Sequence, residues 1–163
     1  MNKLALFWCF FLAIGYTESE VIDGLDVTDL YDKFIIVARG MADNNEYKCS
    51  NHLENHRAKI LPKVENIIRN LKDTSGIATE LIGFAIQLSM IEGFVTDCNI
   101  KELVSTVLTI TTADGIKKMG QNMIDNASAL EGLIQELTAA TNQDTRLLVI
   151  GKIIRKVTGL TFK

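Results

Sequence analysis

The sequence predicts an all-α protein, and three observations carry this prediction. Apolar residues recur at spacings of three and four along nearly the whole chain of 163 residues, as in helices that bury one face. Only one proline, Pro62, interrupts these patterns. Two cysteines, Cys49 and Cys98, bracket a pair of helical patterns of nearly equal length. We therefore expect a disulfide-stapled antiparallel helical hairpin inside a five- to six-helix bundle.

An apolar leader precedes the helical patterns. A short basic start is followed at residues 4–14 by an uninterrupted apolar run, too short to span a bilayer and typical of a signal peptide. Cleavage after Gly15 or Thr17 removes the third cysteine with the leader. This assigns 1–17 to a signal peptide and 18–163 to a single helical domain; an uncleaved anchor or a buried first helix is the alternative. We expect the protein in the extracellular space or the lumen of the secretory pathway.

Each helix of the mature chain has its own signal. The first presents an apolar stripe that includes Leu30. The second contains Pro62, which removes a backbone donor, so we expect a kink near Ile60 or a new helix that starts at the proline. The third starts at Ser75, a suitable N-cap, after a turn-like run at 72–76. The expected helices span residues 26–44, 50–71, 75–97, 101–111, 114–141 and 144–160.

The two mature cysteines are expected to pair. The hairpin turn lies midway between Cys49 and Cys98, so both sulfurs come to the same end. Disulfide-bonded Cα atoms lie roughly 4.4–6.8 Å apart, closer than the axes of packed helices, so the chain must bend inward at these positions. Free catalytic thiols are the alternative, which an exported chain with two cysteines disfavours.

The charge of the chain disfavours nucleic-acid binding. It has 17 basic against 20 acidic residues, a formal net charge of −3. Acidic residues dominate 18–32 and basic residues dominate 146–163. The favoured interpretation is that these ends attract one another or are solvated. The alternative is that they attract neighbouring copies in a structural or self-associating component of secreted material.

The third helix is apolar on more than one side. Residues 81–91 carry no charge, so other helices must surround this one, and a central core helix is the favoured interpretation. The functional alternative is that it lines a cavity for a lipid-like ligand. The side chains that would line this cavity are Phe84, Met90, Ile91 and Phe94.

Helix 114–141 shows the alternating spacing of a helix packed along a partner. An internal partner is favoured over self-association. The single glycosylation sequon, which begins at Asn126, overlaps the packing seam at Ala127, so we expect low or no occupancy. The seam consists of Ile116, Gly120, Met123, Ala127, Leu130, Ile134 and Leu137.

Candidate chemistry is sparse. His52 and His56 share a helical face at the i, i+4 spacing that can chelate a divalent metal. A zinc protease places its glutamate directly after the first histidine, whereas Glu54 lies two residues on, and no third ligand is identifiable. Two solvated histidines are therefore the favoured interpretation. We expect no metal, no other cofactor and no enzyme activity, because the sequence also lacks phosphate loops and zinc-type cysteine pairs.

The segment 146–163 has a basic side and an apolar side in helical projection, with Gly151 on the basic side. Such a helix can rest on a lipid surface, with basic groups toward anionic headgroups. Closure of the bundle is the favoured interpretation, because other apolar stripes need covering. The residues that would face a membrane are Lys152, Ile153, Arg155, Lys156 and Val157.

Four sequence runs follow the leader in a fixed order: ARGMADNNEYKC, IEGFVTDC, GQNMIDN and IGKIIRKVTGL. This layout resembles that of small secreted two-cysteine α-helical proteins of ciliated protozoa. The resemblance implies a secreted helical bundle and assigns no activity. From the residues we expect a secreted, non-enzymatic helical binding protein that sequesters an apolar ligand or contacts a lipid surface through its C-terminal helix.

Overall fold

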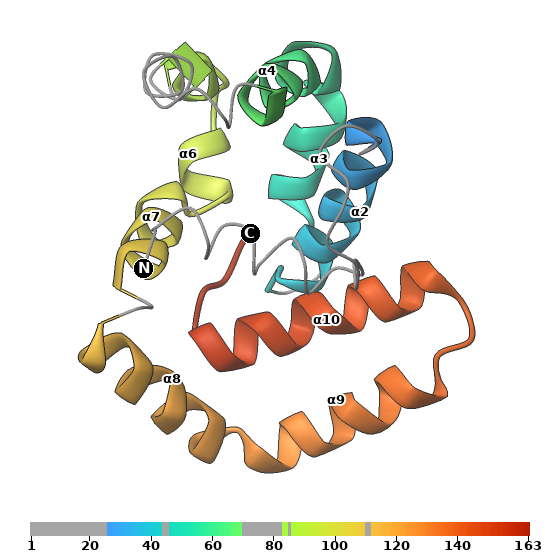
Figure 1. Cartoon of the computed structure of the whole chain (residues 1–163), viewed down its shortest axis with the longest axis vertical. Coiled ribbons are helices and arrows are strands. Elements are labelled where there is room, and N and C mark those ends of the chain that lie inside the picture. Colours follow the sequence, from blue (N-terminus) through green and yellow to red (C-terminus); the bar gives the residue numbers. More distant parts are fainter. Residues whose placement is uncertain (1–25, 44–45, 70–82, 85, 110–111) are drawn as a thin grey trace.

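The computed structural model describes residues 26–43, 46–69, 83–84, 86–109 and 112–163. In this part of the chain the regular structure is helical and no strand occurs, which confirms the all-α prediction. The leader and the hairpin turn at 72–76 lie outside the described residues. The named helices, labelled in Figure 1, are α2 (Val27–Gly40), α3 (Lys48–Asn55), α4 (Arg57–Arg69), α6 (Phe94–Asp97), α7 (Ile100–Thr109), α8 (Ala113–Asp125), α9 (Ala127–Ala139) and α10 (Gln143–Thr158).

Three of these helices begin at a side-chain cap. The Asp26 carboxylate accepts from two backbone N–H groups at the start of α2, and the Thr112 hydroxyl accepts from one at the start of α8. At the start of α10, Asn142 Oδ1 accepts a hydrogen bond from the Thr145 backbone N–H at 2.7 Å. Such caps satisfy backbone donors that have no partner within the helix, and they fix where each helix begins.

Helices α2 and α10 cross with their backbones in close contact. A Cβ built on Gly40 would overlap the carbonyl oxygen of Leu148, and one built on Gly151 would overlap that of Val37. The missing side chains therefore allow the two backbones to approach closely. Gly151, which lies on the basic side of α10 one turn before Arg155, is buried in this crossing, so part of the basic side faces α2 and not solvent.

Helices α8 and α9 cover the side of α10 that faces away from α2 (Figure 1). Asn122 of α8 donates from Nδ2 to the carbonyl oxygen of Val157 at 3.0 Å. On α9, Glu136 Oε1 lies 2.8 Å from Lys152 Nζ. Helix α10 therefore lies between helices on two sides.

The helix expected at 114–141 is divided into two. Helix α8 ends at Asp125 and α9 begins at Ala127, with Asn126 between them at φ −110° and ψ 17°. The Asn126 amide donates from Nδ2 to the Asn122 carbonyl oxygen at 2.8 Å. Such local side-chain bonds compete with helix continuation. The break lets α8 and α9 bend around α10 (Figure 1).

The seam predicted for that helix is not its packing face. Ile116, Met123 and Ile134 are 58, 50 and 55% exposed, and among the seven seam residues, all of them described, only Leu130 is buried. The predicted seam requires a continuous helix, whereas the break at Asn126 lets each half turn a different side toward α10. Ala127 is also exposed, so its packing gives no reason for low glycan occupancy.

Both arms of the expected hairpin are interrupted as well. The first breaks at His56, between α3 and α4, and α4 continues through Pro62, so the boundary does not lie at the proline. The second is helical at 83–84 and 86–89 and leaves the helix before α6, where Gly93 takes a φ of 78°. The expectation of five or six helices is therefore wrong, because the described residues alone hold eight named helices.

The hydrophobic core gathers where α2, α3, α6 and residues 159–163 meet. The buried core cluster consists of Tyr31, Ile35, Val37, Ala38, Met41, Cys49, Leu53, Ile60, Ile91, Phe94, Cys98, Leu147, Leu160 and Phe162.

Within the described ranges, no helix is long and apolar enough to cross a bilayer.

Candidate functional site

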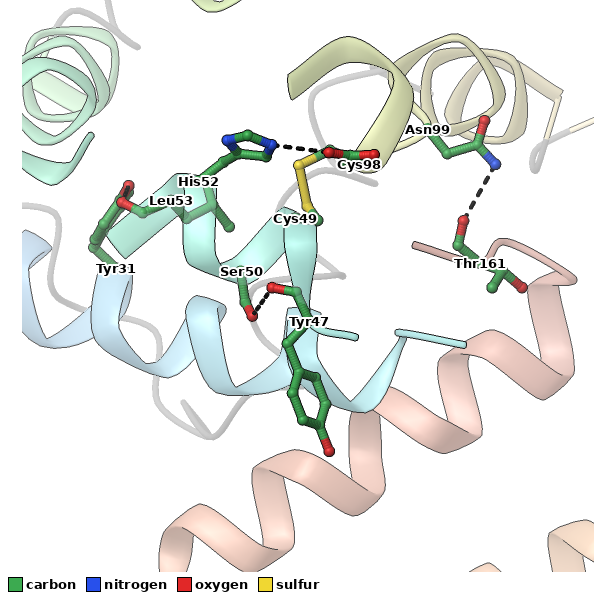
Figure 2. Close-up of a disulfide and its surroundings, with 10 residues drawn as sticks. Tyr31, Tyr47, Cys49, Ser50, His52, Leu53, Cys98, Asn99 and Thr161 are labelled. Atoms are coloured by element: carbon green, nitrogen blue, oxygen red, sulfur yellow. Dashed lines mark hydrogen bonds and ion pairs between the residues drawn. A yellow bond between two sulfur atoms is a disulfide. The ribbon is translucent and has the colours of Figure 1, made fainter. Parts of the chain in front are cut away.

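The disulfide joins α3 to the end of α6, as the cysteine spacing predicted (Figure 2). Cys49 and Cys98 have an S–S distance of 2.07 Å and a Cα–Cα distance of 4.6 Å. Both cysteines are buried. The chain bends at each of them: Tyr47 and Asn99, at φ 51° and 46°, are the positive-φ non-glycine residues of the described chain. The left-handed conformation is costly for tyrosine, and the surrounding contacts must maintain it.

A histidine–aspartate pair lies beside the disulfide (Figure 2). His52 Nε2 on α3 lies 2.9 Å from Asp97 Oδ2 on α6, and both side chains are mostly buried. The His52 ring meets the edge of Phe94 and stacks with His56 at a centroid distance of 6.3 Å. The expectation of two solvated histidines is therefore wrong for His52. Its partner Asp97 lies 45 residues away in sequence, so local spacing gave no signal for the pair.

The hydroxyl and sulfur atoms near the histidine–aspartate pair already have partners. Ser50 is buried and donates its hydroxyl to the Tyr47 carbonyl oxygen at 3.0 Å, and both cysteines are oxidised. The Ser50 hydroxyl and both sulfur atoms are therefore already engaged with partners within the described chain. Among the residues that the structure describes, no three His, Cys, Asp or Glu side chains are placed to hold a metal ion.

Residues 159–163, the tail, complete the disulfide junction. Helix α10 ends at Thr158 with Gly159 as its C-cap, and the tail then returns past the end of α2, where Phe162 forms a parallel bridge with Ala42. The Lys163 carbonyl oxygen accepts from the Cys49 N–H at 2.8 Å, and the Lys163 N–H donates to the Asp97 carbonyl oxygen at 2.7 Å. The tail thus contacts both cysteine-bearing segments, which sequence reasoning missed because the tail lacks a helical pattern.

A shallow pocket of about 420 Å³ lies beside the tail. Its acidic groups already have cationic partners: Arg155 Nη1 lies 3.4 Å from Asp43 Oδ1, and Lys48 Nζ lies 2.8 Å from Glu46 Oε2. A cation would have to displace these partners. The pocket is lined by Asp43, Glu46, Asn99, Thr161, Phe162 and Lys163.

The four predicted ligand-lining residues do not share one environment. Ile91 and Phe94 are buried in the core, and Phe84 packs against it. Met90 is 78% exposed. Three of the four side chains therefore contribute to the packed core, and Met90 contacts solvent.

The predicted membrane-facing residues are half-buried on α10. Lys152 pairs with Glu136 of α9, and Arg155 donates to the carbonyl oxygen of Ala42 after α2. Ile153, Lys156 and Val157 are also half-buried. Because α10 lies between α2 and the α8–α9 pair, a membrane could reach its apolar side only after these helices moved away.

Large exposed apolar side chains lie elsewhere on the described surface. They occur on residues 86–90 and on α6, α7, α8 and α9. These residues are Ile86, Met90, Val95, Val104, Leu108, Ile116, Met123, Ile124 and Ile134.

Comparison of the chain with protein-family models, with curated proteins and with solved structures found no match. The described fold places the chain in the class of all-α proteins with a buried disulfide.

Proposed function

We propose that this chain is a secreted, non-enzymatic helical protein that binds an apolar, lipid-like ligand at its surface. The observation that carries the proposal is the apolar face of α7. Ile100 and Leu103 on this face pack against the core, whereas Val104 and Leu108 are 51 and 58% exposed. Val104 and Leu108 lie one helical turn apart and continue the same face into solvent. We call this exposed pair the α7 face.

Neighbouring elements extend the apolar character of this part of the molecule. Ile86 and Met90, one turn apart, precede α6, and Val95 lies on α6 itself; all three are exposed. Helix α6 contacts α7 at one edge of the molecule (Figure 1). Groups of exposed apolar side chains are a common mark of ligand or partner binding.

The disulfide supports the proposed secretion, and the paired polar side chains support the proposed lack of enzyme activity. A disulfide persists in oxidising compartments, which agrees with export. The candidate catalytic groups contact one another or the backbone: His52 pairs with Asp97, and Ser50 with Tyr47. Binding therefore accounts for the described surface better than catalysis does.

Titration of the secreted, disulfide-bonded chain with a fluorescent acyl-chain probe tests the proposal. We expect saturable binding that the Val104→Glu/Leu108→Glu variant loses, because a charge on the α7 face would have to be desolvated by the bound chain. Ile134→Glu is the matched control, since Ile134 has a similar exposure on α9 and should leave binding unchanged.

Two results would count against the lipid-like ligand. One is probe binding that does not saturate. The other is equal binding by the α7 double variant and the Ile134→Glu control, with both folded by circular dichroism. Mass spectrometry of the secreted chain tests export separately, because a product that retains residues 1–17 contradicts signal-peptide cleavage.

A further inference from the structure

A lysine lies beside the α7 face, toward the start of the helix. Lys101 is exposed and precedes Val104 by three residues and Leu108 by seven, so the three side chains lie along one side of α7. Lys101 and Leu108 are about 10 Å apart along the helix axis. The exposed apolar pair is therefore continued at one end by a single positive charge.

The Lys101 ammonium group has no ionic partner among the described residues. Glu102, the acidic residue of α7, lies on another side of the helix, where its Oε1 is 3.9 Å from Lys118 Nζ. The carboxylate that precedes Lys101 most closely in the chain is Asp97, which pairs with His52. A positive charge next to exposed apolar side chains is thus available to a ligand.

We propose that the ligand of the α7 face is a free single-chain amphiphile with a carboxylate headgroup, such as a fatty acid. Its carboxylate pairs with the Lys101 ammonium group, and its hydrocarbon chain covers Val104 and Leu108. The aliphatic stem of Lys101 adds apolar surface while its ammonium group stays at the boundary with water. The ligand thus matches the charge at one end of this surface and the apolar side chains along the rest. This inference rests on the proposed function, because it names the ligand class of the same face.

The charges favour a free amphiphile over an anionic membrane surface. Attraction to anionic membranes typically needs a cluster of about four to eight basic residues. Helix α7 carries one lysine and one glutamate, and the chain as a whole has a formal net charge of −3. A single lysine matches one headgroup and gives little attraction to a charged surface.

Titration of the secreted, disulfide-bonded chain with two probes at neutral pH tests the inference. The probes share one fluorescent acyl chain and end either in a carboxylate or in its methyl ester. The measured quantity is the ratio of the dissociation constant of the ester to that of the carboxylate. This ratio should be about fivefold larger for the parent chain than for Lys101→Gln, the upper value for an exposed ion pair. Comparison of the two ratios cancels the intrinsic difference between the probes.

A second lysine and a charge reversal give the controls. Lys59 is an exposed lysine on α4, which lies away from α7 in Figure 1, so Lys59→Gln should leave the ratio unchanged. Lys101→Glu should favour a probe of the same chain that ends in an amine, because unlike charges then face each other again. Added salt should lower the ratio of the parent chain toward that of Lys101→Gln.

Three results would overturn the carboxylate ligand. The first is an equal ratio for the parent chain and Lys101→Gln, although saturable binding of both probes would still support the apolar ligand of the α7 face. The second is an equal loss from Lys59→Gln, which indicates a general effect of charge. The third is binding to anionic vesicles but to neither probe, which indicates a membrane surface. A chain that binds neither the probes nor the vesicles contradicts the proposed function as well.

Discussion

Burial in the fold opposes the ionisation of Tyr31. Its hydroxyl donates to the Leu53 carbonyl oxygen at 2.8 Å, which ties α2 to α3. Burial raises the pKa of Tyr31 well above its usual range, while the Arg57 guanidinium, 5.7 Å from the ring centroid, partly opposes this shift. Asp32 pairs with Arg57 and raises the pKa further. The folded state therefore holds the neutral phenol.

Alkaline unfolding tests the effect of Tyr31. Below the usual tyrosine pKa of 10.0 the phenol is neutral in both states, so its contribution to stability is fully present. Above that value the unfolded chain ionises and the folded chain does not, so the free energy of unfolding should fall as pH rises. Tyr31→Phe should remove this part of the fall, and at neutral pH it should cost about 1 kcal/mol because the hydrogen bond to Leu53 is lost. Parallel pH profiles of urea unfolding for the two proteins would contradict the assignment.

At the scale of elements, the contact of α2 with α10 depends on two glycines that sequence patterns could not assign. A glycine inside a helix ordinarily weakens it, and this chain has several such positions. Gly40 and Gly151 differ from Gly132 because the backbone of another helix occupies the space a side chain would fill. The same residue type therefore stabilises the fold in one helix and weakens another.

Glycine-to-alanine substitutions separate these two situations. Gly151→Ala should destabilise the protein by about 1–3 kcal/mol, since the new methyl group forces α10 away from α2. Gly132→Ala should stabilise it by about 0.5–1 kcal/mol, because the methyl group meets open space and the helix gains propensity. Urea unfolding measures both changes. A Gly151→Ala protein as stable as the parent would show that the two backbones are not in close contact.

The helix positions themselves were partly readable from sequence. Periodicity located α2, α7 and α10 to within a few residues, because each is amphipathic and two of the three have a side-chain N-cap. It missed the interruptions at His56 and Asn126, since apolar spacing continues across both positions. Side chain–backbone bonds and tertiary packing determine such breaks, and a one-dimensional pattern does not record them.

For the whole molecule, the disulfide and the tail hold together segments distant in sequence. Cys49 and Cys98 enclose a loop with a sequence separation of 49. The tail meets both of their segments through Lys163 and bonds the Asn99 side chain through the Thr161 carbonyl oxygen. Removal of the disulfide should therefore weaken the hydrogen bonds of the tail, and removal of the tail should destabilise the segments that the disulfide joins.

Removal of the disulfide tests this coupling. Cys49→Ala with Cys98→Ala should lower the free energy of unfolding by about 4 kcal/mol, the chain-entropy value for a loop of this length. The backbone amide of Lys163 should also exchange with solvent faster, because its acceptor, the Asp97 carbonyl oxygen, immediately precedes Cys98. Urea unfolding and amide hydrogen exchange measure the two effects. Unchanged exchange at Lys163 would show that the tail is held independently of the disulfide.

The amino-acid sequence by itself determined the helical class and the pairing of Cys49 with Cys98. Both follow from local spacing, since helical periodicity and the near-symmetric positions of the cysteines need no knowledge of distant contacts. Tertiary structure alone decided which side of each helix is buried, that Gly151 meets Gly40, and that His52 pairs with Asp97. These outcomes depend on how close two backbones approach and which side chains then meet, and residues far apart in the chain set both.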